Sequence, residues 1–258
     1  MIKFFRKIRQ KLLQEKRFSS YVTYAVGEVL LVVIGILLAL QFNNWNNKQM
    51  NVKKEIWYLD NIANDMFNQK SGLEDLKKYY TKTLNVAGEL LLDFKKQKGY
   101  HKLDSLSYRL NELMISYSYP NIDNTYRELL SSGQVSLIKN NDLISDIIDF
   151  YLYTAEIETM FNVNQSQVFY GEVYSVLNKF AQVDLSEIVD DDNLVFEDEE
   201  IKKYLNSELK KTKNKHELTN AIRNKIVILS DYMATLDESI GEVNKMIKAI
   251  DKEITKLK

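Results

Sequence analysis

One carboxylate lies inside the longest apolar stretch of this sequence, and its position has the clearest chemical consequence. Between Tyr21 and Phe42 the only charged side chain is Glu28. A carboxylate inside a bilayer is energetically costly unless it is protonated, paired or close to the membrane surface. Two interpretations stay open: Glu28 lies shallow, within reach of the headgroups, or it contacts another helix.

Small and aliphatic residues recur every four positions beside this carboxylate, at Gly27, Leu31, Gly35 and Ala39. On a helix this spacing forms one face on which two backbones can approach closely. In the second interpretation, this face and Glu28 form a helix contact, either with further copies of the chain or with another membrane protein.

The remaining ionisable residues do not form a recognisable reactive set. An EF-hand loop started at Asp190 would need glycine at its sixth position and a carboxylate at its twelfth, where Val195 and Ile201 stand. The histidines, His101 and His216, stand beside lysines without cysteines or acidic pairs at metal-ligand spacing. We therefore predict no metal, no cofactor and no catalytic residue, and a solvated acidic loop over 184–200.

The stretch 18–45 is predicted to be a single transmembrane helix. A spanning helix needs about 20 predominantly apolar residues. Tyr21 and Tyr24 at one end and Trp45 at the other are predicted membrane-interface anchors, because amphipathic rings favour the headgroup level. Residues 1–17 carry seven basic residues and one acid, and so strong a positive bias keeps that side in the cytoplasm.

A cleaved signal peptide is the competing interpretation of this segment. Cleavage after Ala39 would place Leu37 where a small residue is required, and the basic segment is long for a signal peptide. The arm over 1–17 has apolar residues one helical turn apart, which favours a helix lying on the membrane surface over a disordered topogenic tail. In a bacterium, residues 46–258 would then be periplasmic, without disulfides because the chain has no cysteine.

Charge and composition characterise the rest of the chain. The whole sequence has 35 basic and 36 acidic residues, so the rest holds 28 basic (35 minus 7) and 35 acidic (36 minus 1) residues. Such a mildly acidic body is not a nucleic-acid surface. Only 8 Gly and 1 Pro occur in 258 residues, which indicates long helices and an all-α fold.

Two segments show a heptad pattern, and they are predicted to form stalk helices over about 50–96 and 217–258, with further helices over about 102–212 between them. In the second segment the pattern runs through Ile226, Leu229, Met233, Leu236, Ile240, Val243, Ile247, Ile250, Ile254 and Leu257. In the first it runs through Val52, Ile56, Leu59, Ala63, Met66, Leu73, Tyr80, Leu84, Ala87, Leu91 and Phe94, interrupted by Lys70 and Lys77. Heptads support either an antiparallel hairpin within one chain, which we favour, or a parallel oligomer.

The region between the stalks is predicted to hold shorter helices. A helix from Leu103 stops before Pro120, Asp123 caps the next helix, Gly133 ends it, and Asn140 or its neighbour caps a longer one. The buried stripe of that longer helix is Leu143, Ile147, Phe150, Tyr151, Ile157 and Phe161. Past Asn162 the pattern blurs, and a bend at Gly171 is expected. Seven tyrosines gather in this region, either as a partner surface or as packed rings with wet hydroxyls.

The motifs KFFRKIRQKLL, YAVGEVLLVVIGILLALQFNNWN and TYRELLSSGQVSLIKNNDLISDIIDFY together resemble an uncharacterised family of single-pass membrane proteins found in Bacteroidota. This resemblance implies location and topology and brings no catalytic residues. An acid near the cytoplasmic end of a lone membrane helix is also similar to the proton-coupled subunits of rotary and TonB-type motors, although those usually carry aspartate there.

These observations favour a membrane-anchored helical scaffold or interaction protein of the cell envelope, bound to the lipid bilayer and to itself or another membrane protein. The alternative is a ligand-sensing or proton-coupled accessory subunit. Only about 20 residues lie on the cytoplasmic side, too few for an output domain. Any signal would therefore pass through a separate membrane protein. An enzyme is the least favoured interpretation.

Overall fold

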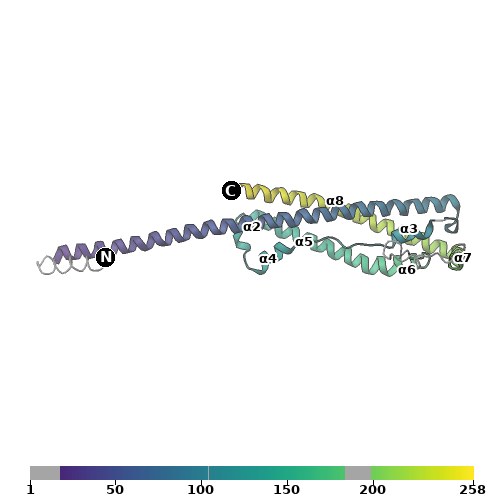
Figure 1. Ribbon diagram of the computed structural model, residues 1–258, viewed down its shortest axis with the longest axis horizontal. Helices are drawn as coiled ribbons and strands as arrows, with labels where there is room; N and C mark the ends of the chain where they lie inside the picture. The colour runs from purple at the N-terminus through teal and green to yellow at the C-terminus, as the bar shows by residue number, and fades with distance from the viewer. Residues whose placement is uncertain (1–17, 104, 184–198) are drawn as a thin grey trace. The chain divides into compact units, whose positions relative to one another are not determined.

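The computed structural model describes residues 18–103, 105–183 and 199–258, and within these ranges the regular structure is helical, without a strand. Its longest element is α2 (Phe18–Gln97), a continuous helix of 80 residues (Figure 1). Internal contacts divide the chain into unit 1, residues 1–57, and unit 2, residues 58–258. The predicted surface helix over 1–17 and most of the predicted acidic loop, 184–198, lie outside the described residues.

Unit 1 contains the one stretch, among the described residues, that is long and apolar enough to cross a membrane. Its most apolar 18-residue window has a mean hydropathy of 2.4, and none of that window is buried. The core helix of a water-soluble protein buries such a surface, whereas here the large aliphatic side chains are exposed, with Leu31 at 66%. Residues 18–45 are helical and apolar enough to cross a membrane, while the crossing itself and the boundaries with the arm and the body stay predictions.

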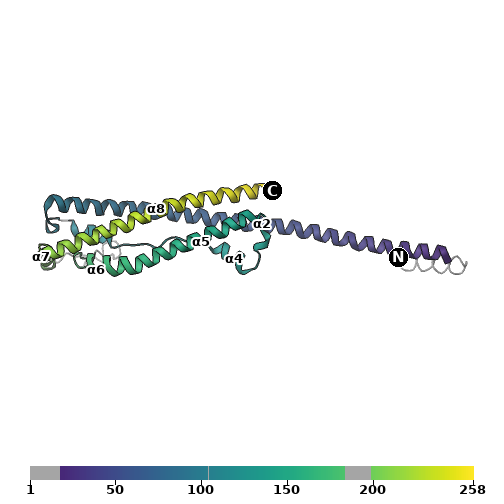
Figure 2. The ribbon, with the colours of Figure 1, turned by 180° about the vertical axis from the view of Figure 1, so that it is seen from behind.

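In unit 2, α2 pairs with α8 (Thr212–Leu257), the other long helix. Lys77 forms an ion pair with Asp237, the Tyr80 and Tyr232 rings lie 5.8 Å apart, and the Tyr100 hydroxyl lies 3.0 Å from that of Thr219. Tyr100 lies just beyond the end of α2. Along these three contacts the residue number in α8 falls as the residue number in and after α2 rises, so the two helices run antiparallel (Figures 1 and 2). This confirms the hairpin within one chain. α8 begins five residues earlier than predicted.

The other elements of unit 2 pack against this hairpin as a further layer. In chain order they are η1 (Tyr100–Lys102), α3 (Leu106–Leu113), α4 (Asn124–Ser131), η2 (Val135–Leu137), α5 (Asn141–Val163), η3 (Asn164–Val173), α6 (Tyr174–Leu177) and α7 (Glu199–Glu208). α5, η3 and α6 each contact α8. The predicted buried stripe of α5 is confirmed in full.

The heptad stripe predicted for α2 is wrong at every second position. The buried residues between 59 and 90 are Leu59, Ile62, Met66, Gln69, Leu73, Leu76, Tyr80, Thr83, Ala87 and Leu90. The structure thus buries Gln69 and Leu76 where the prediction took Lys70 and Lys77. Both lysines lie beside this line of buried residues, which we call the seam. The seam therefore continues past both positions without a break.

The same one-residue displacement occurs in α8. Ile222, Leu229, Leu236, Val243 and Ile250 are buried, but Lys225, Tyr232 and Ser239 occupy the alternate seam positions in place of Ile226, Met233 and Ile240. The physical reason for this displacement is the contact between α8 and the further layer of helices. The Tyr232 ring, for example, stacks on Phe161 of α5 at 3.8 Å. The aliphatic residues that the prediction chose lie at the flank and are only half-buried.

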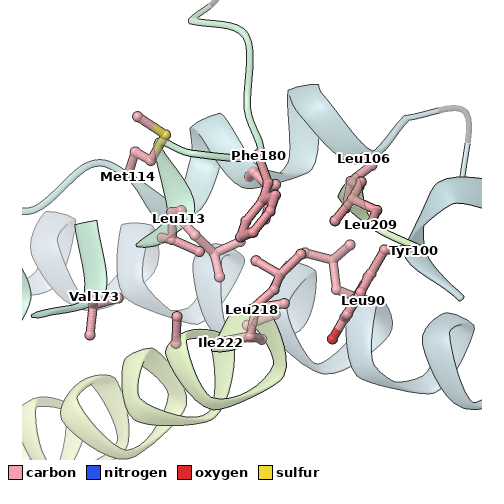
Figure 3. Packing of buried hydrophobic residues seen from close by; sticks show 14 of the residues in the cluster. Leu90, Tyr100, Leu106, Leu113, Met114, Val173, Phe180, Leu209, Leu218 and Ile222 are labelled. Carbon is pink, nitrogen blue, oxygen red and sulfur yellow. The ribbon is translucent and has the colours of Figure 1, made fainter. Parts of the chain in front are cut away.

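One cluster of buried apolar residues lies at the end of unit 2 where α2 stops. Figure 3 shows side chains from α2, α3 and α8 converging there, together with Phe180. Its members are Ala87, Leu90, Tyr100, Leu106, Leu110, Leu113, Met114, Phe169, Val173, Leu177, Phe180, Leu209, Leu218, Ala221 and Ile222. Because they come from six helical elements and from the turns after α3, α6 and α7, this cluster holds the end of α2 and the start of α8 against the further layer.

Caps and turns follow the sequence in part. The Asn140 side chain accepts from the Leu143 N–H (3.2 Å), and Gly133 has a φ of 67°, which confirms two predictions. Asp123 precedes α4 as predicted, but its carboxylate accepts from Arg127 (2.7 Å) instead of a backbone N–H. The N–H of Thr125 donates to Asp65 of α2 at 2.9 Å. A carboxylate sixty residues away therefore caps α4.

The blurred pattern after Asn162 has a structural cause. Residues Asn164–Val173 form η3, a π-helix that joins α5 to α6. A π-helix bonds each residue to the fifth along the chain, so the α-helical periodicity is lost over its length. At Gly171, where the sequence predicts a bend, the structure has a π-helix in place of an α-helix.

Candidate functional site

The first candidate site is the face of α2 around Glu28 in unit 1. Gly27, Glu28 and Leu31 line a hollow of about 400 Å³ together with Tyr24, Leu30 and Ile34. A Cβ atom added at Gly27 or Gly35 would meet nothing within 4 Å, so both glycines leave room for a close neighbour.

Gly35 and Ala39 continue the face of Gly27 and Leu31 at four-residue spacing, outside the hollow. The structure therefore brings three of the five predicted contact residues into one depression and leaves two further along the helix. The helix contact itself stays a prediction.

The predicted interface anchors lie on the same helix. Trp45 is exposed, and its ring lies 5.8 Å from that of Phe42. Tyr24 lies in the wall of the hollow, and the side chain of Tyr21 is outside the described part of the structure. Their function as anchors stays a prediction.

Lys225 is a buried residue in unit 2 that the sequence analysis missed. It is 1% exposed, its Nζ donates to the Ile115 carbonyl (2.9 Å), and Nζ lies 3.8 Å from the centre of the Phe169 ring. Burial lowers the pKa of Lys225 from 10.5 to about 7. Lys225 occupies a seam position, one residue before the aliphatic Ile226. The correct heptad register would have identified it as a buried residue from the sequence.

A second polar set lies at the middle of the hairpin. Gln69 is completely buried, and among the described residues neither its amide oxygen nor its amide nitrogen has a hydrogen-bond partner; the same holds for the Tyr119 hydroxyl. Burial raises the pKa of Tyr119, and the Ser239 and Gln69 side chains lie close enough to its hydroxyl to lower that pKa in part, although neither meets the geometry of a hydrogen bond. Buried polar positions of this kind cost stability and favour one register of paired helices.

The central tyrosines divide between the two predicted environments. Tyr119 and Tyr151 are buried, as packed rings would be, whereas Tyr117 and Tyr170 are about half exposed. Burial raises the pKa of Tyr151 above its ordinary value of 10. The partner-surface interpretation therefore stays open for Tyr117 and Tyr170.

No group of three or more His, Cys, Asp or Glu side chains suited to a metal occurs within the described ranges. The arrangement described above comprises an exposed apolar helix face in unit 1 and a buried lysine in unit 2. No curated protein and no solved structure matches the chain. A family of unknown function, DUF6090, matches residues 28–206, which is more than half of the sequence. The chain therefore belongs to the DUF6090 family.

Proposed function

We propose that this protein is a membrane-anchored helical scaffold of the bacterial cell envelope, with its N-terminal arm in the cytoplasm and unit 2 in the periplasm. The observation that carries the proposal is the exposed apolar surface of α2 in unit 1, of which the most apolar window is not buried at all. An exposed surface of this length is costly in water and favourable in a bilayer.

The charge distribution supports the orientation. Seven basic residues precede the apolar stretch, whereas only Lys48, Lys53 and Lys54 follow it closely. This asymmetry favours a cytoplasmic N-terminus. The continuous helix through Ala39 also supports an uncut anchor, since signal peptidase needs a suitable cleavage site and Leu37 disfavours one there.

We further propose that the face of Gly27, Glu28 and Leu31 holds copies of the chain together in the membrane. The two glycines allow close backbone approach, and a carboxylate in an apolar environment gains from a polar neighbour on a second helix. Unit 2, by contrast, satisfies its own heptads within one chain and has no need of a second copy.

The test is mass measurement of the full chain after gentle detergent extraction, for the wild type, Glu28→Gln and Gly27→Leu. We expect a homogeneous multimer for the wild type and a smaller species for Gly27→Leu, because leucine fills the space that the partner helix needs. Val33→Leu is the matched control on an exposed position. A monomeric wild type, or a multimer unchanged in both variants, would refute self-association through this face.

The second candidate is a proton-coupled or sensing accessory subunit, which the single acid inside the apolar stretch favours. In that case the extracted wild type would carry a multi-helix membrane protein in fixed proportion, and Glu28→Gln would abolish the partner's activity while leaving the complex intact. Co-purification therefore distinguishes the two candidates.

A further inference from the structure

Lysines gather at the end of unit 2 where α2 stops and α8 begins. We call this surface the basic end; it comprises Lys95, Lys96, Lys98, His101, Lys102, Lys210, Lys211, Lys213 and Lys215. α7 contacts η1, and the Tyr100 hydroxyl lies 3.0 Å from that of Thr219 in α8, so the two halves of this set meet in space. Figures 1 and 2 show the α2 terminus and α7 at the same end of unit 2.

Electrostatics confirm that these charges are close together. Burial, and then the positive charges of Lys210, Lys215 and Lys102, lower the pKa of His101. Three different segments thus contribute to one positive potential around this ring.

Carboxylates neutralise only part of this surface within the described residues. Glu208 pairs with Lys211, and Glu217 pairs with Lys213 (3.8 Å) and Lys179 (4.0 Å). Among the described residues, no ion pair forms at the other six lysines of this set. These six are Lys95, Lys96, Lys98, Lys102, Lys210 and Lys215, of which Lys102 donates to the Gln97 carbonyl.

α7 presents apolar side chains beside these lysines. None of its residues is buried, and Tyr204 and Ile201 are 61% and 44% exposed. Lys202 and Lys203 lie on the same short helix, where Lys202 forms an ion pair with Glu199 at 3.8 Å. α7 has three glutamates, Glu199, Glu200 and Glu208, against these two lysines, so it adds exposed aliphatic and aromatic side chains to this end and no net positive charge. The positive charge comes from the lysines outside α7.

An apolar hollow adjoins the same end. It has a volume of about 550 Å³ between α2 and α8, and Leu91, Leu92 and Phe94 line it together with Lys95 and Arg223. This surface combines apolar walls with lysines that form no ion pair in the part of the chain that the structure describes. It matches a lipid headgroup region better than a soluble polyanion, which offers nothing to the apolar part.

We propose that the basic end of unit 2 binds the surface of an anionic lipid bilayer. The lysines attract the anionic headgroups, and Tyr204 and Ile201 insert among them. This gives the protein a lipid contact in addition to the apolar stretch of unit 1. The proposal depends on unit 2 alone and holds whether or not the chain self-associates.

The seven acids within 184–198 oppose attraction to an anionic surface whatever conformation they adopt, since their charge has the wrong sign. Replacing Asp190, Asp191 and Asp192 with asparagine should therefore strengthen binding. This expectation has the opposite direction to every lysine substitution, which makes it an independent check.

The experiment places the full chain in nanodiscs of neutral phosphatidylcholine and measures its flotation with added vesicles. One vesicle population is pure phosphatidylcholine, and the other contains about 40% phosphatidylglycerol, whose negative surface attracts basic residues. We expect flotation with the anionic vesicles alone, and we expect its loss when NaCl rises from about 0.05 M to about 0.5 M.

Two matched triple variants locate the contact. Lys98→Gln, Lys210→Gln and Lys215→Gln together should weaken binding roughly a hundredfold, at about fivefold per lysine. The control carries Lys78→Gln, Lys248→Gln and Lys252→Gln, which remove the same charge from exposed positions elsewhere in unit 2. It should bind like the wild type.

A second pair of variants separates the apolar contribution and the N-terminal arm. Tyr204→Ser with Ile201→Ser should weaken binding while leaving its salt dependence unchanged. Neutralising Lys3, Arg6 and Lys7 tests whether the arm causes the flotation. Loss of binding in the arm variant alone, equal loss in both lysine triples, or no flotation of the wild type would overturn the proposal.

Discussion

Replacing the buried cation Lys225 with methionine should stabilise the protein. The pKa of Lys225 is lowered from 10.5 to about 7 by burial. At about 1.4 kcal/mol for each pKa unit, this difference corresponds to a cost of about 5 kcal/mol at neutral pH. Truncation leaves the Ile115 carbonyl unpaired, at about 1 kcal/mol, and removes the contact with the Phe169 ring. We therefore expect Lys225→Met to raise the free energy of unfolding by about 2 to 4 kcal/mol at pH 7.

The pH dependence gives the sign of the effect independently. Above the unfolded pKa of 10.5 both states hold Lys225 neutral, so burial has no electrostatic cost. Between 10.5 and about 7 the unfolded chain binds a proton that the folded protein does not, and stability falls as the pH falls. Below about 7 both states are protonated and the cost is constant. The advantage of methionine should therefore grow as the pH decreases through this window and then level off.

Urea unfolding of the full chain in detergent micelles, followed by helical circular dichroism, measures this difference. Lys248→Met is the matched control, because Lys248 lies exposed on the same helix. It should change the free energy of unfolding little and equally at every pH. A Lys225→Met variant that is less stable than the wild type at pH 7, or an advantage that does not change between about pH 7 and about pH 10, would refute the reasoning.

The same unfolding assay checks three further expectations. Asp65→Ala should cost about 1 kcal/mol by uncapping α4, whereas Asp123→Ala should cost less than about 0.5 kcal/mol because it caps no N–H; equal losses would contradict the cap. Lys98→Gly should stabilise by about 1 kcal/mol, since Lys98 has a φ of 59°, and a loss would show that its side chain has another function. Gln69→Leu should stabilise by about 1 to 3 kcal/mol, because neither polar atom of its buried amide has a hydrogen-bond partner among the described residues; a destabilised variant would contradict this.

The sequence predicts the helical class, the hairpin and several helix ends because those features depend on local patterns. Asn140 and Gly133 illustrate this, since a cap and a left-handed residue are set by their immediate neighbours. The heptad register is harder to predict, because half of the alternate buried positions carry polar residues such as Gln69 and Lys225, whereas adjacent positions such as Ile226 are aliphatic. Only the further layer, absent from any local pattern, decides that Tyr232 is buried and Met233 lies at the flank.

The features that sequence reasoning missed depend on distant contacts. The Asp65 carboxylate on α2 caps α4, and no local spacing in the sequence predicts this contact. Lys225 appears as an ordinary surface lysine until the alternate register places it in the seam, against Phe169 in the π-helix η3. That π-helix in turn has no sequence signal beyond the loss of periodicity.

The absence of cysteine from the chain allows the most direct test of the topology on which the proposed function rests. Single cysteines would replace Lys258 at one end and Lys3 at the other, and intact cells with a permeabilised outer membrane would be treated with a membrane-impermeant maleimide. We predict that the cysteine at 258 is labelled at once and the cysteine at 3 only after lysis. Labelling of the two sites in the opposite order, or recovery of the protein in the soluble fraction, would contradict a membrane-anchored scaffold.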